Sequence, residues 1–170
     1  VIKKLKESPK CGKIYALPGN GGISELAECV NIKATDVSAI VDFAVENNID
    51  FAVVTPDDPL VLGVVDRLHE KGIKCFGPEA SAAIIEGSKV FSKNLMKKYG
   101  IPTAQYEVFD SAEDALAYLD SAPVPTVIKA DGLALGKGVI IAATRDEAKE
   151  AVVEIMRDKK FGKSGDSIVI

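Results

Sequence analysis

The sequence lacks the side chains that several common kinds of site require. It has a single histidine, His69, so neither a Ser-His-Asp nor a Cys-His catalytic set can be assembled. The cysteines include no C-x-x-C pair, and each lies in or beside an apolar run: Cys11, Cys29 and Cys75. We therefore expect free, buried thiols in a reducing compartment. No apolar run approaches the ~20 residues of a membrane span and no signal peptide is visible, which favours a cytoplasmic protein without a membrane partner.

The sequence has no excess of positive charge. The formal net charge is −4, with 21 Lys and Arg against 25 Asp and Glu, which argues against nucleic acid as the main partner. A composition of 47% hydrophobic and 27% charged residues is typical of globular proteins, and 170 residues can form one sizeable core or two small ones. The negative average still leaves room for a locally basic pocket.

The first half of the chain alternates short apolar strands with helices. We predict strands at residues 13–17, 29–32, 51–55 and 74–76, and helices from 37 and over 59–71. Asp36 is well placed to cap the first of these helices, and Gly72 to follow the second. The β-α-β-α order predicts an α/β domain with a parallel sheet and right-handed crossovers.

The pattern changes near Gly87, and we place a domain boundary at residues 86–88, giving domains 1–87 and 88–170. Beyond it we expect helices over 88–99, 111–120 and 144–158, and strands over 105–109, 124–130, 139–142 and 167–170. The strands on either side of the loop 131–138 should form an antiparallel hairpin. The chain opens on what looks like the tail of a helix without an N-cap and closes on a strand, so we expect a segment of a longer protein.

The loop 131–138 combines three glycines with a lysine. Glycine removes the Cβ obstruction, so backbone N–H groups can approach phosphate oxygens, and a lysine adds a compact charge. The spacing is not that of a P-loop, because Gly132 and Gly136 are too close and Gly138 stands where Ser or Thr is required. A plain glycine-containing hairpin is the alternative interpretation.

Lysines near this loop favour a phosphate site. Lys129 lies in an apolar strand, where a lysine needs an anionic partner or must reach solvent. On the helix before it, Lys89, Lys93 and Lys97 share one stripe, for which a solvated basic face is the simpler explanation, less so for Lys93. Together with Lys137 of the loop, Lys93 and Lys129 could hold a polyanion, and a triphosphate fits.

Three turns in the first half follow predicted strands: 18–22, 55–60 and 76–80. Ligands of open parallel sheets bind at the carboxyl ends of the strands, so we expect the three turns to converge on one sheet edge. Each alone could be an ordinary turn, since Pro, Gly, Asn and Asp dominate turns. Asp57 and Asp58 are too sparse a pair for a metal site, and we predict no metal ligands in this segment.

The combined motifs resemble the phosphoribosylamine–glycine ligase family of ATP-grasp enzymes over nearly the whole chain. The resemblance rests on Pro18-Gly-Asn-Gly-Gly22, Thr55-Pro-Asp-Asp-Pro-Leu60, Phe76-Gly-Pro78, Glu86-Gly-Ser-Lys89, Gly100-Ile-Pro-Thr103 and Lys129-Ala-Asp-Gly-Leu-Ala-Leu-Gly-Lys-Gly138. It implies a Rossmann-like pre-ATP-grasp α/β domain followed by the first α+β part of an ATP-grasp domain. It also implies a purine-biosynthesis ligase that phosphorylates glycine with ATP and Mg²⁺ and transfers the glycyl group to 5-phosphoribosylamine.

The resemblance also assigns residues. ATP would contact Lys93, Lys129 and a mobile flap over 131–138, with Asp131, Gly132, Gly136, Lys137 and Gly138 as cofactor-binding residues. Phosphoribosylamine would lie near Pro18, Gly19, Asn20, Asp57 and Pro78. No catalytic residue is assigned within the segment, the Mg²⁺ ligands would lie outside it, and the whole protein would be a monomer.

The chain departs from the family pattern in several places. It begins after the family's Gly-Gly-Arg-Glu-His-type turn, and Thr55-Pro-Asp57 stands where the family usually has Gly-Pro-Glu. The segment that grips adenine should follow Ile170, so we expect the 170 residues alone to be inactive. Two alternatives stay open: another ATP-grasp ligase or carboxylase, such as a biotin carboxylase relative, and a non-catalytic nucleotide-binding module.

Overall fold

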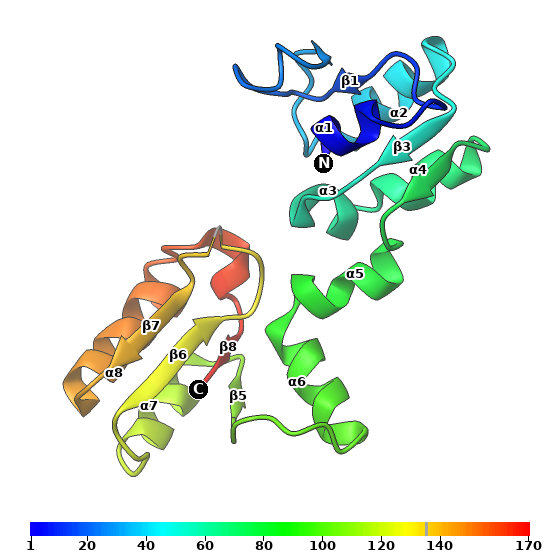
Figure 1. Cartoon of the computed structure of the whole chain (residues 1–170). Coiled ribbons are helices and arrows are strands. Elements are labelled where there is room, and N and C mark those ends of the chain that lie inside the picture. Colours follow the sequence, from blue (N-terminus) through cyan, green and yellow to red (C-terminus); the bar gives the residue numbers. More distant parts are fainter. Residues whose placement is uncertain (135) are drawn as a thin grey trace. The chain divides into compact units, whose positions relative to one another are not determined.

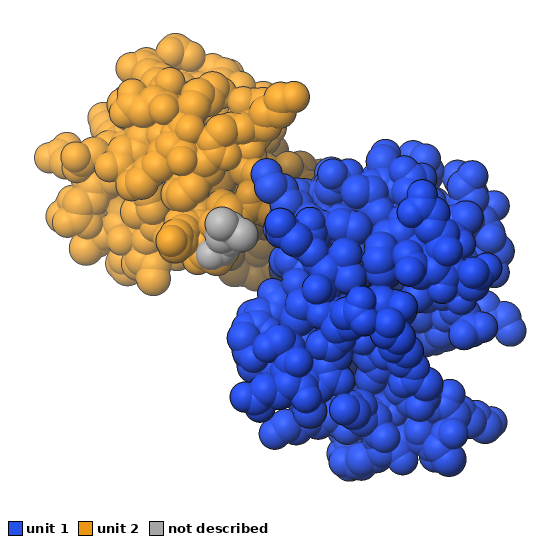
Figure 2. All heavy atoms as spheres, turned by 90° about the horizontal axis from the view of Figure 1, so that it is seen from above, with its two compact units in different colours: residues 1–81 blue, residues 82–170 orange. Residues whose placement is uncertain are grey.

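The structure is a computed structural model that describes residues 1–134 and 136–170. Leu135, in the predicted glycine loop, lies outside the described residues. The chain forms two compact units, residues 1–81 and 82–170 (Figure 2). Both contain helices and short strands, as the sequence predicts, but their sheets are built differently.

The first unit contains parallel strands and the helices between them (Figure 1). Its elements are α1 (Ile2–Lys6), β1 (Tyr15–Ala16), β2 (Glu28–Cys29), α2 (Val37–Glu46), β3 (Phe51–Val53), α3 (Asp57–Val61), α4 (Val64–Glu70) and β4 (Lys74–Phe76). Strand β1 pairs with β2 and β3 pairs with β4, both in parallel. Parallel pairing is therefore confirmed, although the strands are shorter than predicted and form two separate two-stranded sheets.

The core of this unit lies between α2 and α4, which pack together against β3 and β4. Its buried residues are Val41, Ala44, Val64, Leu68 and Ile73. The predicted cap of α2 is confirmed, because the Asp36 carboxylate accepts a hydrogen bond from the Ala39 amide at 3.1 Å.

Two helix predictions need correction. The helix expected over 59–71 is two helices, because Gly63 has φ +81° and ends the run between α3 and α4. A left-handed residue cannot continue an α-helix, and glycine adopts that conformation without steric cost. In addition, the structure contains a helix that was not predicted, α5 (Ala80–Gly87). The sequence analysis ended a turn at residue 80 and predicted neither helix nor strand over 81–87.

The second unit is an antiparallel sheet with helices, in the sheet order β5-β8-β6-β7. Its elements are α6 (Lys89–Lys98), β5 (Val108–Phe109), α7 (Ala112–Leu119), β6 (Thr126–Ala130), β7 (Val139–Ala142), α8 (Arg145–Val152), a π-helical turn (Val153–Arg157), a 3₁₀ turn (Gly162–Gly165) and β8 (Ile168–Val169). The predicted hairpin is confirmed by the antiparallel register that pairs Lys129 with Val139.

Helices α7 and α8 cover one face of this sheet (Figure 1). Ile128 and Ala130 of β6 are fully buried in the core with Leu119 and Val152. Because side chains alternate along a strand, Lys129 projects from the opposite face. The helices therefore hide the apolar side of β6 and leave its lysine free for the site described below.

The expectation of buried thiols is wrong. Cys29 is exposed, Cys11 and Cys75 are half-buried, and all three are free. Cys29 lies in a two-residue strand that only β1 flanks, so an apolar sequence context does not bury it. None of the helices among the described residues is long and apolar enough to cross a membrane.

Candidate functional site

The root of the glycine loop is tied to the beginning of α6. The Asp131 carboxylate accepts hydrogen bonds from the Ser88 hydroxyl at 2.9 Å and from the Val90 amide at 2.7 Å. The Lys89 amide donates to the Asp131 carbonyl at 3.1 Å. An anion is favourable at a helix N-terminus because free N–H groups and the helix dipole both point toward it. The Asp131 side chain thus binds the protein's own helix, which defines its role more closely than the sequence could.

Lys89 joins this arrangement through its ammonium group. Its Nζ donates to the carbonyl oxygens of Asp131 and Gly132 at 3.2 and 3.0 Å. Partial burial lowers the pKa of Lys89, and the charge of Lys129 lowers it further, while Asp131 and Glu86 act in the opposite direction. The sequence analysis placed Lys89 only on a helical stripe and missed this contact. The one available signal was its position directly after the N-cap Ser88 in the motif Glu86-Gly-Ser-Lys89.

Lys93 lies one turn further along α6. Its Nζ donates to the Thr103 hydroxyl at 2.7 Å and to the Ala104 carbonyl at 3.1 Å, and it lies 5.3 Å from the centroid of the Tyr106 ring. Desolvation lowers the pKa of Lys93, and so does the charge of Lys129. Lys129 therefore acts electrostatically on Lys89 and Lys93 of α6.

We call Lys89, Lys93 and Lys129 the lysine cluster. Within the part of the chain that the structure describes, no carboxylate lies within 4.0 Å of any of the three ammonium groups. Asp131 and Glu86 only partly offset the repulsion among these ammonium groups, since the pKa of Lys89 is still lowered, and a bound anion would reduce that cost. The cluster is thus suited to a polyanionic ligand.

The glycine loop supplies backbone donors next to the cluster. The N–H groups of Leu133, Ala134 and Gly138 have no hydrogen-bond partner among residues 1–134 and 136–170. Gly138 is confined, since a Cβ there would lie 2.7 Å from the Ala134 Cβ. Gly136 has φ +74° and open space around it, and Lys137 is exposed at the tip. Free N–H groups beside cations form the kind of nest that binds phosphate.

In the first unit the structure brings two of the three predicted turns together. Asp57 begins α3 after β3, and Pro78 follows β4, its parallel neighbour. The Val54 amide donates to the Phe76 carbonyl at 2.9 Å, which joins the carboxyl ends of the two strands. Both candidate residues are exposed at this edge.

The third turn follows β1, which belongs to the other two-stranded sheet. The Asn20 side chain accepts from the Ile23 amide at 3.0 Å and so shapes its own turn. Gly19 has φ +78°, and a Cβ there would collide with Cys29. Pro18 is exposed. Among the described residues, no strand pairing joins this turn to the edge at Asp57 and Pro78.

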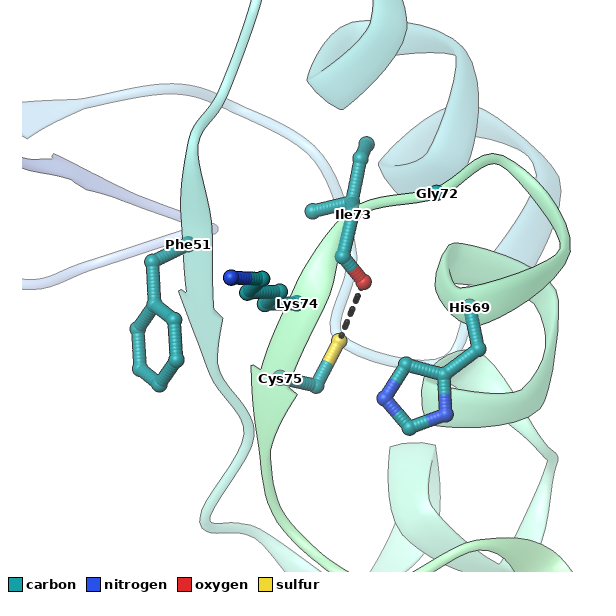
Figure 3. Close-up of a pocket in the computed structure, with 6 residues that line it drawn as sticks. All are labelled: Phe51, His69, Gly72, Ile73, Lys74 and Cys75. Atoms are coloured by element: carbon teal, nitrogen blue, oxygen red, sulfur yellow. Dashed lines mark hydrogen bonds between the residues drawn. The ribbon is translucent and has the colours of Figure 1, made fainter.

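An open hollow of about 500 Å³ lies elsewhere on the first unit (Figure 3). It is lined by Phe51, His69, Gly72, Ile73, Lys74 and Cys75. Burial raises the pKa of the Cys75 thiol, whose sulfur lies 3.5 Å from the Ile73 carbonyl. Phe51 and Lys74 are the first residues of their strands, so the hollow is not at the carboxyl edge where ligands of parallel sheets bind.

Acidic and soft metal ligands are not gathered anywhere in the described chain. No group of three or more His, Cys, Asp or Glu side chains that could hold a metal ion occurs in residues 1–134 and 136–170.

Comparison with known families matches the entire chain. The family model for the phosphoribosylglycinamide synthetase N domain matches residues 1–86, and that for the ATP-grasp (A) domain of the same enzyme matches residues 87–170. The phosphoribosylamine–glycine ligase of Caldanaerobacter subterraneus subsp. tengcongensis is 47% identical over 100% of this chain and 41% of its own length. That of Halalkalibacterium halodurans is 48% identical over 98% of this chain and 39% of its own. The chain thus spans about two fifths of these relatives.

Two solved structures resemble this chain. The Thermotoga maritima phosphoribosylamine–glycine ligase superposes with a TM-score of 0.74 at 28% identity, over 98% of this chain and 38% of that one. The biotin carboxylase domain of Hydrogenobacter thermophilus 2-oxoglutarate carboxylase, solved with MgADP and bicarbonate, gives a TM-score of 0.75 at 22% identity, covering 99% and 40%. The second likeness shows the fold alone.

Proposed function

The chain belongs to the phosphoribosylglycinamide synthetase family, and from this premise we propose that it is part of an ATP-dependent ligase that joins glycine to 5-phosphoribosylamine. ATP would phosphorylate the glycine carboxylate and leave as ADP. The amine of phosphoribosylamine would then attack the glycyl carbonyl, forming the amide and expelling phosphate. The single observation that carries the nucleotide part is the lysine cluster. Its three cations have no ion-pair partner among the described residues, and they lie beside a loop whose Leu133, Ala134 and Gly138 N–H groups have no hydrogen-bond partner among those residues.

Phosphoryl transfer requires what this region offers. Its transition state spreads negative charge over the transferred oxygens, so catalysis depends mostly on positioning and charge neutralisation. Lys89 and Lys129 flank the loop root, and Lys93 lies further along α6. We assign these three lysines to the phosphates of ATP, adding Lys89 to the pair predicted from the sequence.

The loop residues divide by role. Gly138 and Lys137 would contribute an N–H group and a charge to the phosphates, and Gly136 would allow the left-handed turn between the loop's two halves. Asp131 would act through the helix that it caps, and Gly132 through its contacts with the protein.

Phosphoribosylamine is proposed to bind the first unit. The Asp57 carboxylate can accept hydrogen bonds from ribose hydroxyls, and Pro78 lies on the neighbouring turn. Pro18, Gly19 and Asn20 would form another wall of this pocket. Under this proposal residues 1–87 form the substrate-binding domain and 88–170 begin the ATP-grasp domain.

The remaining features follow from the same reaction. Mg²⁺ would be carried by the ATP phosphates and by ligands outside this segment, since the described residues offer no acidic cluster. Small molecules, not nucleic acid, would be the partners. We propose a cytoplasmic, monomeric enzyme.

A substrate-dependence assay separates this function from its alternatives. In the complete protein that contains this chain, ADP release should require both glycine and phosphoribosylamine. ADP release that depends on bicarbonate instead would indicate a carboxylase, which the fold likeness to a biotin carboxylase domain makes the second candidate. ATP binding without turnover would indicate a non-catalytic module.

The site itself is tested by Lys129→Ala. One charge-assisted contact to phosphate is worth ~1.5–3 kcal/mol, so the Kd for a non-hydrolysable ATP analogue should rise about ten- to a hundredfold. Lys97→Ala is the matched control, because Lys97 is exposed on α6 and should leave the Kd within about twofold. Equal affinity of the Lys129 variant and the wild type would overturn the phosphate assignment.

A further inference from the structure

A second element, the 3₁₀ turn Gly162–Gly165, also holds the root of the glycine loop. The Ser164 hydroxyl donates to the Leu133 carbonyl at 2.6 Å, and the Gly132 amide donates to the Ser164 carbonyl at 3.2 Å. Two consecutive loop residues are thus bound by one residue that lies about 30 positions later in the chain.

The close approach of Ser164 explains why residue 132 is glycine. A Cβ at Gly132 would lie 2.6 Å from the Ser164 Oγ, 2.9 Å from its Cβ and 3.0 Å from its Cα. Real side chains do not tolerate such distances, so any larger residue would push the loop and the turn apart. The structure therefore explains Gly132 by packing against Ser164, whereas the sequence suggested phosphate access.

The turn that carries Ser164 rests on a packed base. Gly165 is buried, and a Cβ there would lie 2.5 Å from the carbonyl oxygen of Ile155, a fully buried residue of the π-helical turn. The Ser167 carbonyl, just beyond, accepts from the Asp131 amide at 3.0 Å. The backbone next to Ser164 is consequently fixed by packing against Ile155, while Ser164 itself binds the glycine loop.

Both polar backbone groups of Gly132 are therefore engaged within the protein, its N–H by Ser164 and its carbonyl by Lys89. The Leu133 carbonyl and the Ala134 N–H belong to the next peptide unit. In a trans peptide these two groups lie in one plane and point in opposite directions. A hydrogen bond that fixes the carbonyl therefore also fixes the direction of the N–H, and the Ala134 N–H has no partner in the described chain.

We propose that Ser164 is a positioning residue for nucleotide binding. Its hydroxyl holds the Leu133 carbonyl and thereby directs the Ala134 N–H at a phosphate oxygen of ATP. This inference rests on the proposed nucleotide function and adds to it a residue that contacts no ligand itself.

The test is Ser164→Ala in the complete protein, which removes the hydroxyl but keeps the backbone carbonyl that binds Gly132. Loss of one neutral hydrogen bond predicts a Kd for the ATP analogue about three- to tenfold higher. The KM for ATP should rise by a similar factor, while the KM for glycine stays within about twofold. Ser121→Ala is the matched control, since among the described residues the exposed Ser121 hydroxyl makes one hydrogen bond, to the Tyr118 carbonyl at 3.4 Å. An unchanged Kd in Ser164→Ala would overturn the inference.

A double-mutant cycle tests the contact with Gly132 directly. Gly132→Ala should weaken nucleotide binding more when Ser164 is present than in the Ser164→Gly background, because that change removes the Oγ and Cβ that the new methyl group meets. Additive effects would contradict the proposed packing. A binding loss that is matched by a lower Tm without nucleotide, and that Ser164→Thr does not restore, would assign Ser164 to stability alone.

Failure of this inference can be told apart from failure of the proposed function. If the wild-type protein does not bind the ATP analogue, the nucleotide function itself is wrong. If the wild type binds it and Ser164→Ala binds it equally well, only the role of Ser164 is wrong.

Discussion

The glycine loop of the second unit and the turns of the first unit are both candidate binding regions, yet they are held in different ways. Around Asp131 and Gly132, hydrogen bonds arrive from α6 and from the turn of Ser164, segments 31 to 43 residues away in sequence. Asn20, by contrast, is fixed by Ile23, three residues away, and Asp57 and Pro78 are exposed. The nucleotide region is thus held by side-chain hydrogen bonds between distant segments, whereas the turns of the first unit are held by short-range hydrogen bonds and by the backbone pairing of their strands.

The difference has a chemical reason. A site for a triphosphate must hold cations together at a cost, so it needs a rigid frame. Exposed turns at a sheet edge need only their own hydrogen bonds, because solvent satisfies the remaining groups. Substitutions should therefore disturb the second unit more than the first.

The largest expected effect is that of Asp131→Ala. The change leaves the Ser88 hydroxyl and the Val90 amide without their acceptor, which should lower the local free energy of opening at the start of α6 by about 1–3 kcal/mol. Hydrogen exchange in peptides covering 88–95 should then accelerate roughly 5- to 150-fold.

Asp57→Ala in the first unit provides the comparison. Asp57 is exposed in the first turn of α3, so its loss should cost less than about 1 kcal/mol locally. If exchange in the two regions accelerates equally, the contrast between a preorganised loop and a locally held turn is wrong.

An effect of intermediate size is expected on the pH dependence of stability, through the pKa of Lys89. Burial and Lys129 lower the pKa of Lys89 below its usual 10.5, so between these two pKa values the unfolded chain binds more protons than the folded chain. The folded state is therefore penalised below the lowered pKa, and stability rises with pH through this window.

Bound phosphate should reverse this shift, because an anion favours the charged ammonium. Binding of the ATP analogue at alkaline pH should then take up protons, measured as a binding heat that depends on the ionisation enthalpy of the buffer. Lys89→Met should reduce the proton uptake to the part that Lys93 contributes, because the pKa of Lys93 is lowered too, and Lys97→Met should leave the uptake unchanged. Ribose 5-phosphate, which probes the first unit, should bind without proton uptake by Lys89. Equal uptake in Lys89→Met and wild type would show that Lys89 does not face the nucleotide.

The smallest effect is expected for Asn20→Ala. Only the hydrogen bond to the Ile23 amide is lost, and the backbone carbonyl of residue 20 still accepts from the same amide. The KM for phosphoribosylamine should rise by less than about tenfold, with the KM for ATP unchanged. A change in the KM for ATP alone would place the Asn20 turn with the nucleotide.

Local features of the fold were readable from the sequence. Ser111 and Thr144 accept from the amides of Asp114 and Glu147, as expected for N-caps followed by helical periodicity. Lys129 was identified because a lysine is out of place in an apolar strand, and the hairpin around it has the predicted antiparallel register.

What could not be predicted depends on contacts between distant residues. The prediction that Cys29 is buried was wrong, because burial depends on the strands and helices that flank a short strand and not on the apolar residues beside it in the sequence. The break at Gly63 was hidden because glycine is tolerated within a helical pattern, and only the packed backbone shows its positive φ.

By itself, the sequence determined the alternation of elements, the helix caps, the glycine loop and the presence of lysines near it, because these follow from periodicity and from residue conformational preferences. The tertiary structure alone decided that Lys89 joins the cluster, that Asp131 caps α6 and that the Ser164 hydroxyl binds the Leu133 carbonyl. The physical reason is that each of these contacts joins residues 31 to 43 positions apart, and only packing of the whole unit brings such residues together.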